Sequence, residues 1–104
     1  MAPVLCAEET KALQDGLASL KTTAPSQKED VDEIRASFDS LIQAIEAAPE
    51  TAAHRRMELD VNLEAFKVRS KQNAPLIKDL HGRIASLMKC HGIKAPGNGA
   101  SKAR

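Results

Sequence analysis

The chain has 104 residues, only two aromatic side chains, Phe38 and Phe66, and a formal net charge of +1. This length suits one domain, and the shortage of aromatic residues favours helices packed through Leu, Ile, Val, Ala and Met over a strand-rich core. No apolar run reaches the ~20 residues of a membrane-spanning helix, and the basic residues are not interleaved with aromatics. We therefore expect no membrane insertion and no nucleic-acid partner.

The first helical pattern spans residues 4–21. Glu8 and Glu9 fall in its opening turn, where the helix dipole favours acidic side chains. One stripe of the pattern faces a core and consists of Cys6, Thr10, Leu13, Leu17 and Leu20.

The second helix follows the turn TTAPS, in which Ser26 is a candidate N-cap and Glu29 completes a capping box. Its buried stripe has an unbroken spacing of three and four residues: Val31, Ile34, Phe38, Leu41, Ile45 and Ala48. Pro49 predicts its end.

A third helix is expected from about Glu50, and Pro75 lies in the middle of its pattern. The spacing of three and four continues through Ser70 and Asn73 and beyond the proline, although a proline inside a helix costs about 3 kcal/mol. The unbroken spacing favours one kinked helix over residues 50–91, and a break with a short fourth helix over residues 76–91 is the alternative. The predicted fold is all-α: a three-helix antiparallel bundle whose last helix is kinked or broken at Pro75.

The end of the chain differs in composition from the rest. Gly92 is a candidate C-cap, and the following residues are mostly Gly, Ala and Lys. We expect a helical domain over residues 1–92 and a disordered basic tail over residues 93–104.

Cys6 and Cys90 lie near opposite ends of the chain, and no secretory signal precedes them. We expect two free thiols in the reducing cytoplasm. A zinc site of these cysteines with His81 and His91 lacks the usual ligand spacing, so neither a metal nor another cofactor is expected.

Catalytic chemistry is not expected either. The acidic cluster Glu29, Asp30, Asp32 and Glu33 opens a helix, where the dipole explains it, and no nucleophile motif or phosphate-binding loop is present.

Protein binding is the function that the pattern favours. The predicted last helix is longer than the others, so its stripe, formed by Ile77, Leu80, Ile84 and Leu87, either stays open to a partner helix or closes within the bundle. An open stripe would also support self-association into a homo-oligomer.

The segment FDSLIQAIEAAPETAAHRRMELDVNLEAF, residues 38–66, resembles the last two helices of a BAG domain. This module binds the nucleotide-binding domain of seventy-kilodalton heat-shock chaperones and promotes nucleotide release. The resemblance implies chaperone contacts by Glu46, in the place of an acidic residue of the second helix, and by Arg56 and Glu64, in the places of an arginine and a glutamine of the third. Ala36 departs from the pattern, which usually has another acidic contact there.

Two further expectations concern these regions. Arg56 could instead pack its stem on the seam and pair with Glu46 or Glu50. The segment IKDLHGRIASLMKCHG, residues 77–92, resembles KxDL-type coiled-coil subunits of lysosome-positioning assemblies, through Lys78, Asp79 and Leu80 with the following Ile84 and Leu87. The sequence thus predicts a non-catalytic BAG-like co-chaperone, with a structural coiled-coil subunit as the alternative.

Overall fold

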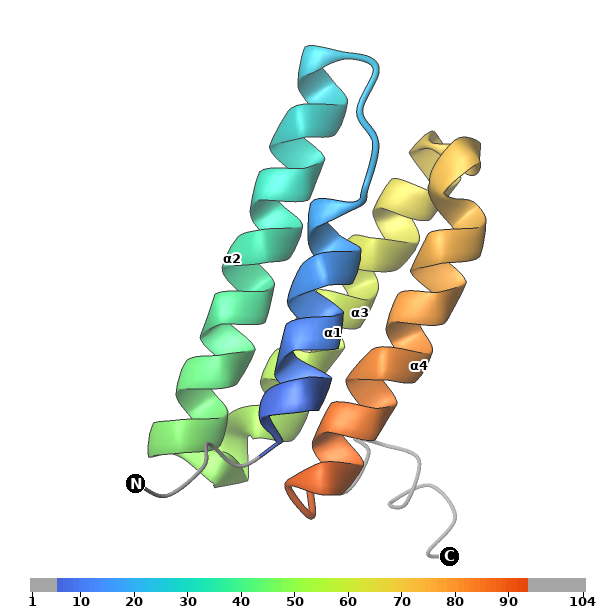
Figure 1. Cartoon of the computed structure of the whole chain (residues 1–104). Coiled ribbons are helices and arrows are strands. Elements are labelled where there is room, and N and C mark those ends of the chain that lie inside the picture. Colours follow the sequence, from blue (N-terminus) through green and yellow to red (C-terminus); the bar gives the residue numbers. More distant parts are fainter. Residues whose placement is uncertain (1–5, 94–104) are drawn as a thin grey trace, which may run out of the picture.

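The computed structural model describes residues 6–93, and the helices lie side by side (Figure 1). Within this range there are four α-helices and no strand, so the all-α prediction is confirmed. The helices are α1 (Ala7–Ala18), α2 (Pro25–Ala47), α3 (Ala52–Arg69) and α4 (Ala74–Cys90). Two short 3-10 turns, η1 (Pro49–Thr51) and η2 (Lys71–Asn73), precede α3 and α4.

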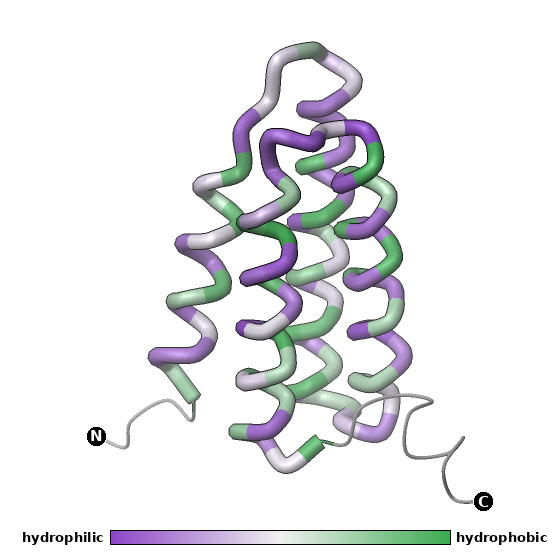
Figure 2. The backbone as a smooth tube through the Cα atoms, turned by 90° about the vertical axis from the view of Figure 1, so that its right-hand side faces the viewer, coloured by the Kyte–Doolittle hydropathy of each residue, from purple (hydrophilic) through white to green (hydrophobic). Residues whose placement is uncertain are grey.

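Successive helices run in opposite directions (Figure 1). Helix α2 packs along α3, and α4 packs against both α3 and α1. Figure 2 shows hydrophobic and hydrophilic residues alternating around each helix, as expected for elements with one face in a core.

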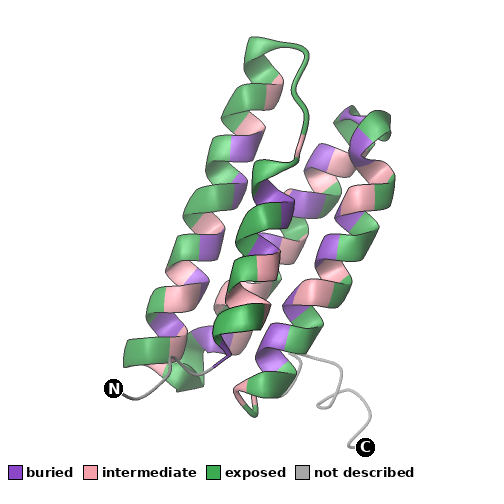
Figure 3. Cartoon of the chain, in the orientation of Figure 1, coloured by how far each residue is buried: buried purple, intermediate pink, exposed green. Residues whose placement is uncertain are grey.

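Most positions of the predicted stripes lie in the core (Figure 3), but Thr10, Leu20, Ile45 and Ala48 are only half-buried, and Ala44 and Met88 are buried in addition. Each fully buried Leu, Ile or Phe contributes about 1.5–3 kcal/mol relative to an exposed one, so these positions supply most of the driving force for folding. The largest fully buried side chains are Phe66, Leu13, Ile34, Leu41, Leu59, Leu63, Ile77, Leu80, Ile84, Leu87 and Met88.

The chain breaks before Pro75, so the favoured prediction of one kinked helix over residues 50–91 is wrong. Helix α3 ends at Arg69, Ser70 is extended (φ −139°, ψ 83°), and Pro75 lies in the first turn of α4. A proline costs little there because the first-turn N–H groups have no partner within the helix. Only residues 70–73 separate the two helices, close to one turn of 3.6 residues, which explains why the spacing continued across the break.

The polar seam residues Ser70 and Asn73 are both 3% exposed and form a hydrogen-bonded tie between two connections. The Asn73 amide nitrogen donates to the Lys21 carbonyl oxygen (2.7 Å) and contacts the Ser70 hydroxyl (2.7 Å). The Lys21 N–H donates to the Asn73 side-chain oxygen (2.9 Å). One buried side chain therefore joins the segment after α1 to the turn before α4.

Helix α2 begins one residue earlier than its expected N-cap. Pro25 occupies the first turn, and Ala24 is the N-cap without a side-chain hydrogen bond, so the predicted Ser26–Glu29 capping box is wrong. Gln27 folds back onto the preceding turn, where its side-chain oxygen accepts hydrogen bonds from the Thr23 N–H (2.8 Å) and hydroxyl (3.0 Å). The predicted end near Pro49 agrees with the last residue of α2, Ala47.

Helix α4 ends in a glycine cap, as the sequence predicts. Gly92 has φ +74°, its N–H donates to the Lys89 carbonyl (3.0 Å), and the Ile93 N–H donates to the Met88 carbonyl (2.8 Å). This is the bond pattern of a Schellman motif. Ile93, which the sequence assigned to the expected tail over residues 93–104, packs against the core, and residues 94–104 lie outside the described residues.

Cys6 and Cys90 form a disulfide, so the prediction of two free thiols is wrong. Their Cα atoms lie 6.0 Å apart although 84 residues separate them in sequence, because α1 and α4 run in opposite directions and bring these ends together. The bond joins the first described residue to the last residue of α4. The argument for a reducing cytoplasm, which rested on free thiols, loses its basis.

Candidate interaction surfaces

The stripe of α4 is closed in this structure. Ile77, Leu80, Ile84 and Leu87 are each 0% exposed, and α1 and α3 pack over them. The sequence left open whether this stripe faces a partner or the core, and the structure answers in favour of the core. These four residues are therefore not available as a contact surface in this conformation.

Close packing of the backbone holds α1 on α4. A Cβ atom at Gly16 would lie 2.5 Å from Leu80 Cδ2, so only glycine lets the helices approach this closely without a shift of Leu80. One turn further along α4, Arg83 Nη1 donates to the Ala12 carbonyl oxygen (2.6 Å). Helix α1 is thus part of the core rather than a loosely attached segment.

A polar cluster joins the neighbouring flanks of α3 and α4. Both ring nitrogens of His81 face carboxylates: Nδ1 lies 3.0 Å from Asp60 Oδ1, and Nε2 lies 2.7 Å from Glu64 Oε2. Because ionised carboxylates only accept, both contacts are hydrogen bonds only when the ring carries two protons. Lys67 adds an ion pair to Glu64 at 3.0 Å.

These contacts stabilise the charged form of Glu64. The hydrogen bond from Lys67, and then that from His81, lower the pKa of its carboxyl group below the ordinary value of 4.5. The side chain is 49% exposed, so solvent screens the interaction.

Arg56 lies at the end of this cluster. Its Nε atom is 3.3 Å from Asp60 Oδ2 in an ion pair, but it is buried and not aligned for a hydrogen bond. The pairing with Glu46 or Glu50 that the sequence suggested is therefore wrong, because the acceptor lies one turn along the same helix.

The three residues that the BAG resemblance singles out are not brought together. Arg56 and Glu64 lie on the flank of α3 that faces α4. Glu46 is exposed on α2, two turns after Asp39, which lines a groove with residues of α1. Glu46 therefore projects from a different flank of the molecule than the other two residues.

The exposed apolar surface lies elsewhere, on the outer side of α3. Met57, Val61 and Val68 are 46%, 63% and 75% exposed and are the large hydrophobic residues exposed within residues 6–93. Their spacing of four and seven residues places them on one face of the helix. Sequence reasoning missed this face because it followed the buried seam, although the spacing was present as a signal.

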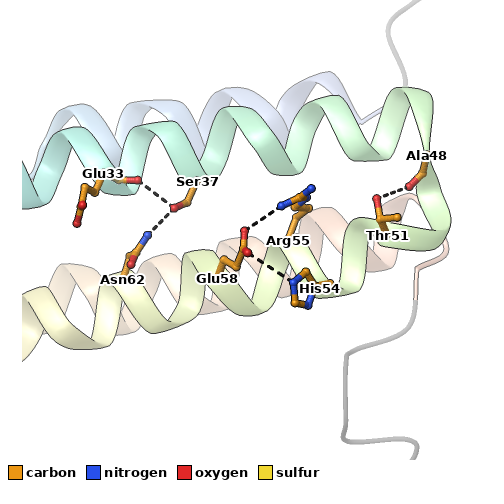
Figure 4. Close-up of polar contacts among 8 residues, drawn as sticks. All are labelled: Glu33, Ser37, Ala48, Thr51, His54, Arg55, Glu58 and Asn62. Atoms are coloured by element: carbon orange, nitrogen blue, oxygen red, sulfur yellow. Dashed lines mark hydrogen bonds and ion pairs between the residues drawn. The ribbon is translucent and has the colours of Figure 1, made fainter.

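A shallow groove of about 430 Å³ runs between this face and α2. Polar contacts fix its walls (Figure 4): the Asn62 amide donates to the Ser37 hydroxyl, and Glu58 pairs with His54 at 3.5 Å and with Arg55 at 3.3 Å. The groove is lined by Ser37, His54, Met57, Glu58, Val61 and Asn62.

The acidic cluster at the start of α2 is not a paired-carboxylate site. Asp30 accepts two hydrogen bonds from Arg69, at 2.9 and 2.8 Å, and this contact raises the pKa of the guanidinium. Glu29, Asp32 and Glu33 are exposed. Of the four acidic residues, Asp30 therefore links α2 to α3 through its ion pair with Arg69.

Comparisons with protein families, curated proteins and solved structures find no match to this chain. The BAG and KxDL resemblances remain predictions. No helix within residues 6–93 combines the length and apolar character needed to cross a membrane.

Proposed function

We propose that this protein is a non-catalytic helical module that binds another protein through the outer face of α2 and α3. The observation that supports the proposal is the row of exposed apolar side chains Met57, Val61 and Val68, of which the first two line a groove. Single exposed hydrophobic residues are common, whereas apolar side chains gathered on one face can bury area together against a partner. We call these three residues the α3 apolar row.

As the partner we propose the nucleotide-binding domain of a seventy-kilodalton heat-shock chaperone, because residues 38–66, which resemble a BAG domain, include the end of α2 and most of α3. The structure changes which residues we expect to dominate. Arg56 is engaged with Asp60, and Glu46 lies on another flank, so the α3 apolar row is proposed as the centre of the contact.

The coiled-coil alternative, in which the protein is a subunit of a larger assembly, would use the α4 stripe. It requires α1 to leave α4, since Leu80 and its neighbours are fully buried. Self-association through this stripe has the same requirement.

The test is a titration of the chain against a purified chaperone nucleotide-binding domain. Val61→Asp places a charge in the α3 apolar row at a site that is 63% exposed, so it should keep the helicity and weaken binding at least about tenfold. Ala85→Asp is the matched control, because it adds the same charge at an exposed position of α4 and should leave binding unchanged.

Three results are informative. Loss of binding by Arg56→Ala but not by Val61→Asp would move the contact to the charged flank of α3. Equal losses in Val61→Asp and Ala85→Asp would show that the charge acts without a local contact. If the unmodified chain has no affinity at tens of micromolar, the chaperone proposal is overturned.

A further inference from the structure

We propose that the reduced protein binds a thiophilic divalent cation, zinc, through the Cys6 and Cys90 sulfurs and the Glu9 carboxylate. The proposal is independent of the protein-binding function, because the site is built where α1 begins and α4 ends and shares no residue with the α3 apolar row.

The geometry supports the proposal. The two sulfurs and a Glu9 carboxylate oxygen all lie within 4.8 Å of one another. Ligand atoms of a tetrahedral zinc site lie about 2.0–2.3 Å from the ion and hence about 3.5–4 Å apart. The two bonded sulfurs must therefore move apart when the disulfide is reduced, and rotation of the cysteine side chains can provide this movement. The backbone positions need not separate, since the two Cα atoms are already 6.0 Å apart.

The donor set also suits the metal. Two thiolates and one carboxylate give three protein ligands, which is the number found in zinc sites that keep a fourth position for water. Cys90 is exposed, so this position can face solvent, whereas Cys6 is only 7% exposed and anchors the site to the core. Gly16 and Arg83 keep α1 on α4 independently of the sulfurs, which helps the ligands stay together after reduction.

The chemical step is a two-electron reduction. A phosphine attacks the exposed Cys90 sulfur, breaks the S–S bond and becomes a phosphine oxide with oxygen from water, leaving two thiols. Zinc then displaces one proton from each thiol and binds the two thiolates, so metal affinity should rise with pH. The disulfide and the metal are thus alternative links between the same two helix ends.

The experiment titrates zinc into the full chain, with and without a phosphine reductant under anaerobic conditions, against a chromophoric zinc chelator. Cobalt(II) is the spectroscopic probe, because thiolate coordination gives a sulfur-to-metal charge-transfer band. We expect one equivalent to bind to the reduced chain, with release of protons, and none to the oxidised chain. Cys6→Ser should abolish tight binding.

Glu9→Gln and Glu8→Gln form a matched pair, since both remove one negative charge from the first turn of α1, and Glu8 is not among the converging ligands. Removing the carboxylate ligand should weaken zinc binding at least about tenfold, whereas Glu8→Gln should change it little. Equal effects of the two variants would overturn the role of Glu9 and the proposed site.

Helicity measured by circular dichroism covers the case in which reduction unfolds the chain. Zinc should then restore the helicity, because a metal that binds only the folded state stabilises it. Reduced protein that neither binds zinc more tightly than Cys6→Ser nor regains helicity with zinc would overturn the proposal.

Discussion

Asn73 offers a sharp test of how the connections are held together. Replacing it with alanine removes the hydrogen bonds to the Lys21 N–H and carbonyl and to the Ser70 hydroxyl. Each bond contributes about 1 kcal/mol, and a polar group left buried without a partner costs about 1–3 kcal/mol. Because Ser70 is buried while Lys21 can recover some hydrogen bonds from water, we expect Asn73→Ala to lower the free energy of unfolding by about 2–4 kcal/mol.

Urea unfolding followed by circular dichroism measures this loss. With a slope of roughly 1–2 kcal/mol per molar urea, the midpoint should fall by about 1–4 M. The control is Asn62→Ala, which removes a hydrogen bond to Ser37 at a part-buried site and should cost no more than about 1 kcal/mol. If the two variants lose the same stability, the buried tie does not hold the connections, and the reasoning is refuted.

Other predictions concern the disulfide, the polar cluster and the core. In the chain-entropy model a bond across 84 residues contributes about 4–5 kcal/mol, so Cys90→Ser should lower the melting temperature strongly, and an unchanged melt would contradict the bond. Contacts with Lys67 and His81 lower the pKa of Glu64, so its contribution to stability is present above pH 4.5 and is lost as the pH falls through the folded-state pKa. The difference in melting temperature between the unmodified chain and Glu64→Gln should therefore shrink on acidification. Leu80→Asp buries an unpaired charge and should abolish helicity, whereas retained helicity with altered association would favour an open stripe.

The helices could be predicted from the sequence because each carries its own pattern. The spacing of apolar residues identified the buried faces of α2, α3 and α4, and Pro49 and Gly92 marked ends that the structure retains. Pro75 was recognised as a position at which the helix kinks or breaks, and the break that the structure contains was the less favoured of the two predictions. A four-residue connection over residues 70–73 is close to one helical turn, so the apolar residues keep nearly the same spacing as they would in a continuous helix. Periodicity therefore cannot distinguish a broken helix from a continuous one.

The candidate surfaces were less predictable. Of the residues that the BAG resemblance singled out, Arg56 turned out to be paired with Asp60, and this pair follows the helical spacing of four. The α3 apolar row was visible as a spacing, but a spacing alone does not say which of two apolar faces becomes buried. That choice depends on the side from which α2 and α4 approach α3.

The sequence by itself determined which segments are helical, where most of these helices end and which of their apolar faces are suited to a core. These properties arise from interactions between residues a few positions apart. The tertiary structure decided that α1 covers the α4 stripe, that Asn73 reaches Lys21, and that the Cys6 and Cys90 sulfurs meet beside Glu9. Each of these contacts joins residues more than fifty positions apart, except that between Glu9 and Cys6. These contacts form only once the helices are packed together. Which helices become neighbours, and how closely they pack, decides which distant side chains come within bonding distance, and no local pattern encodes this.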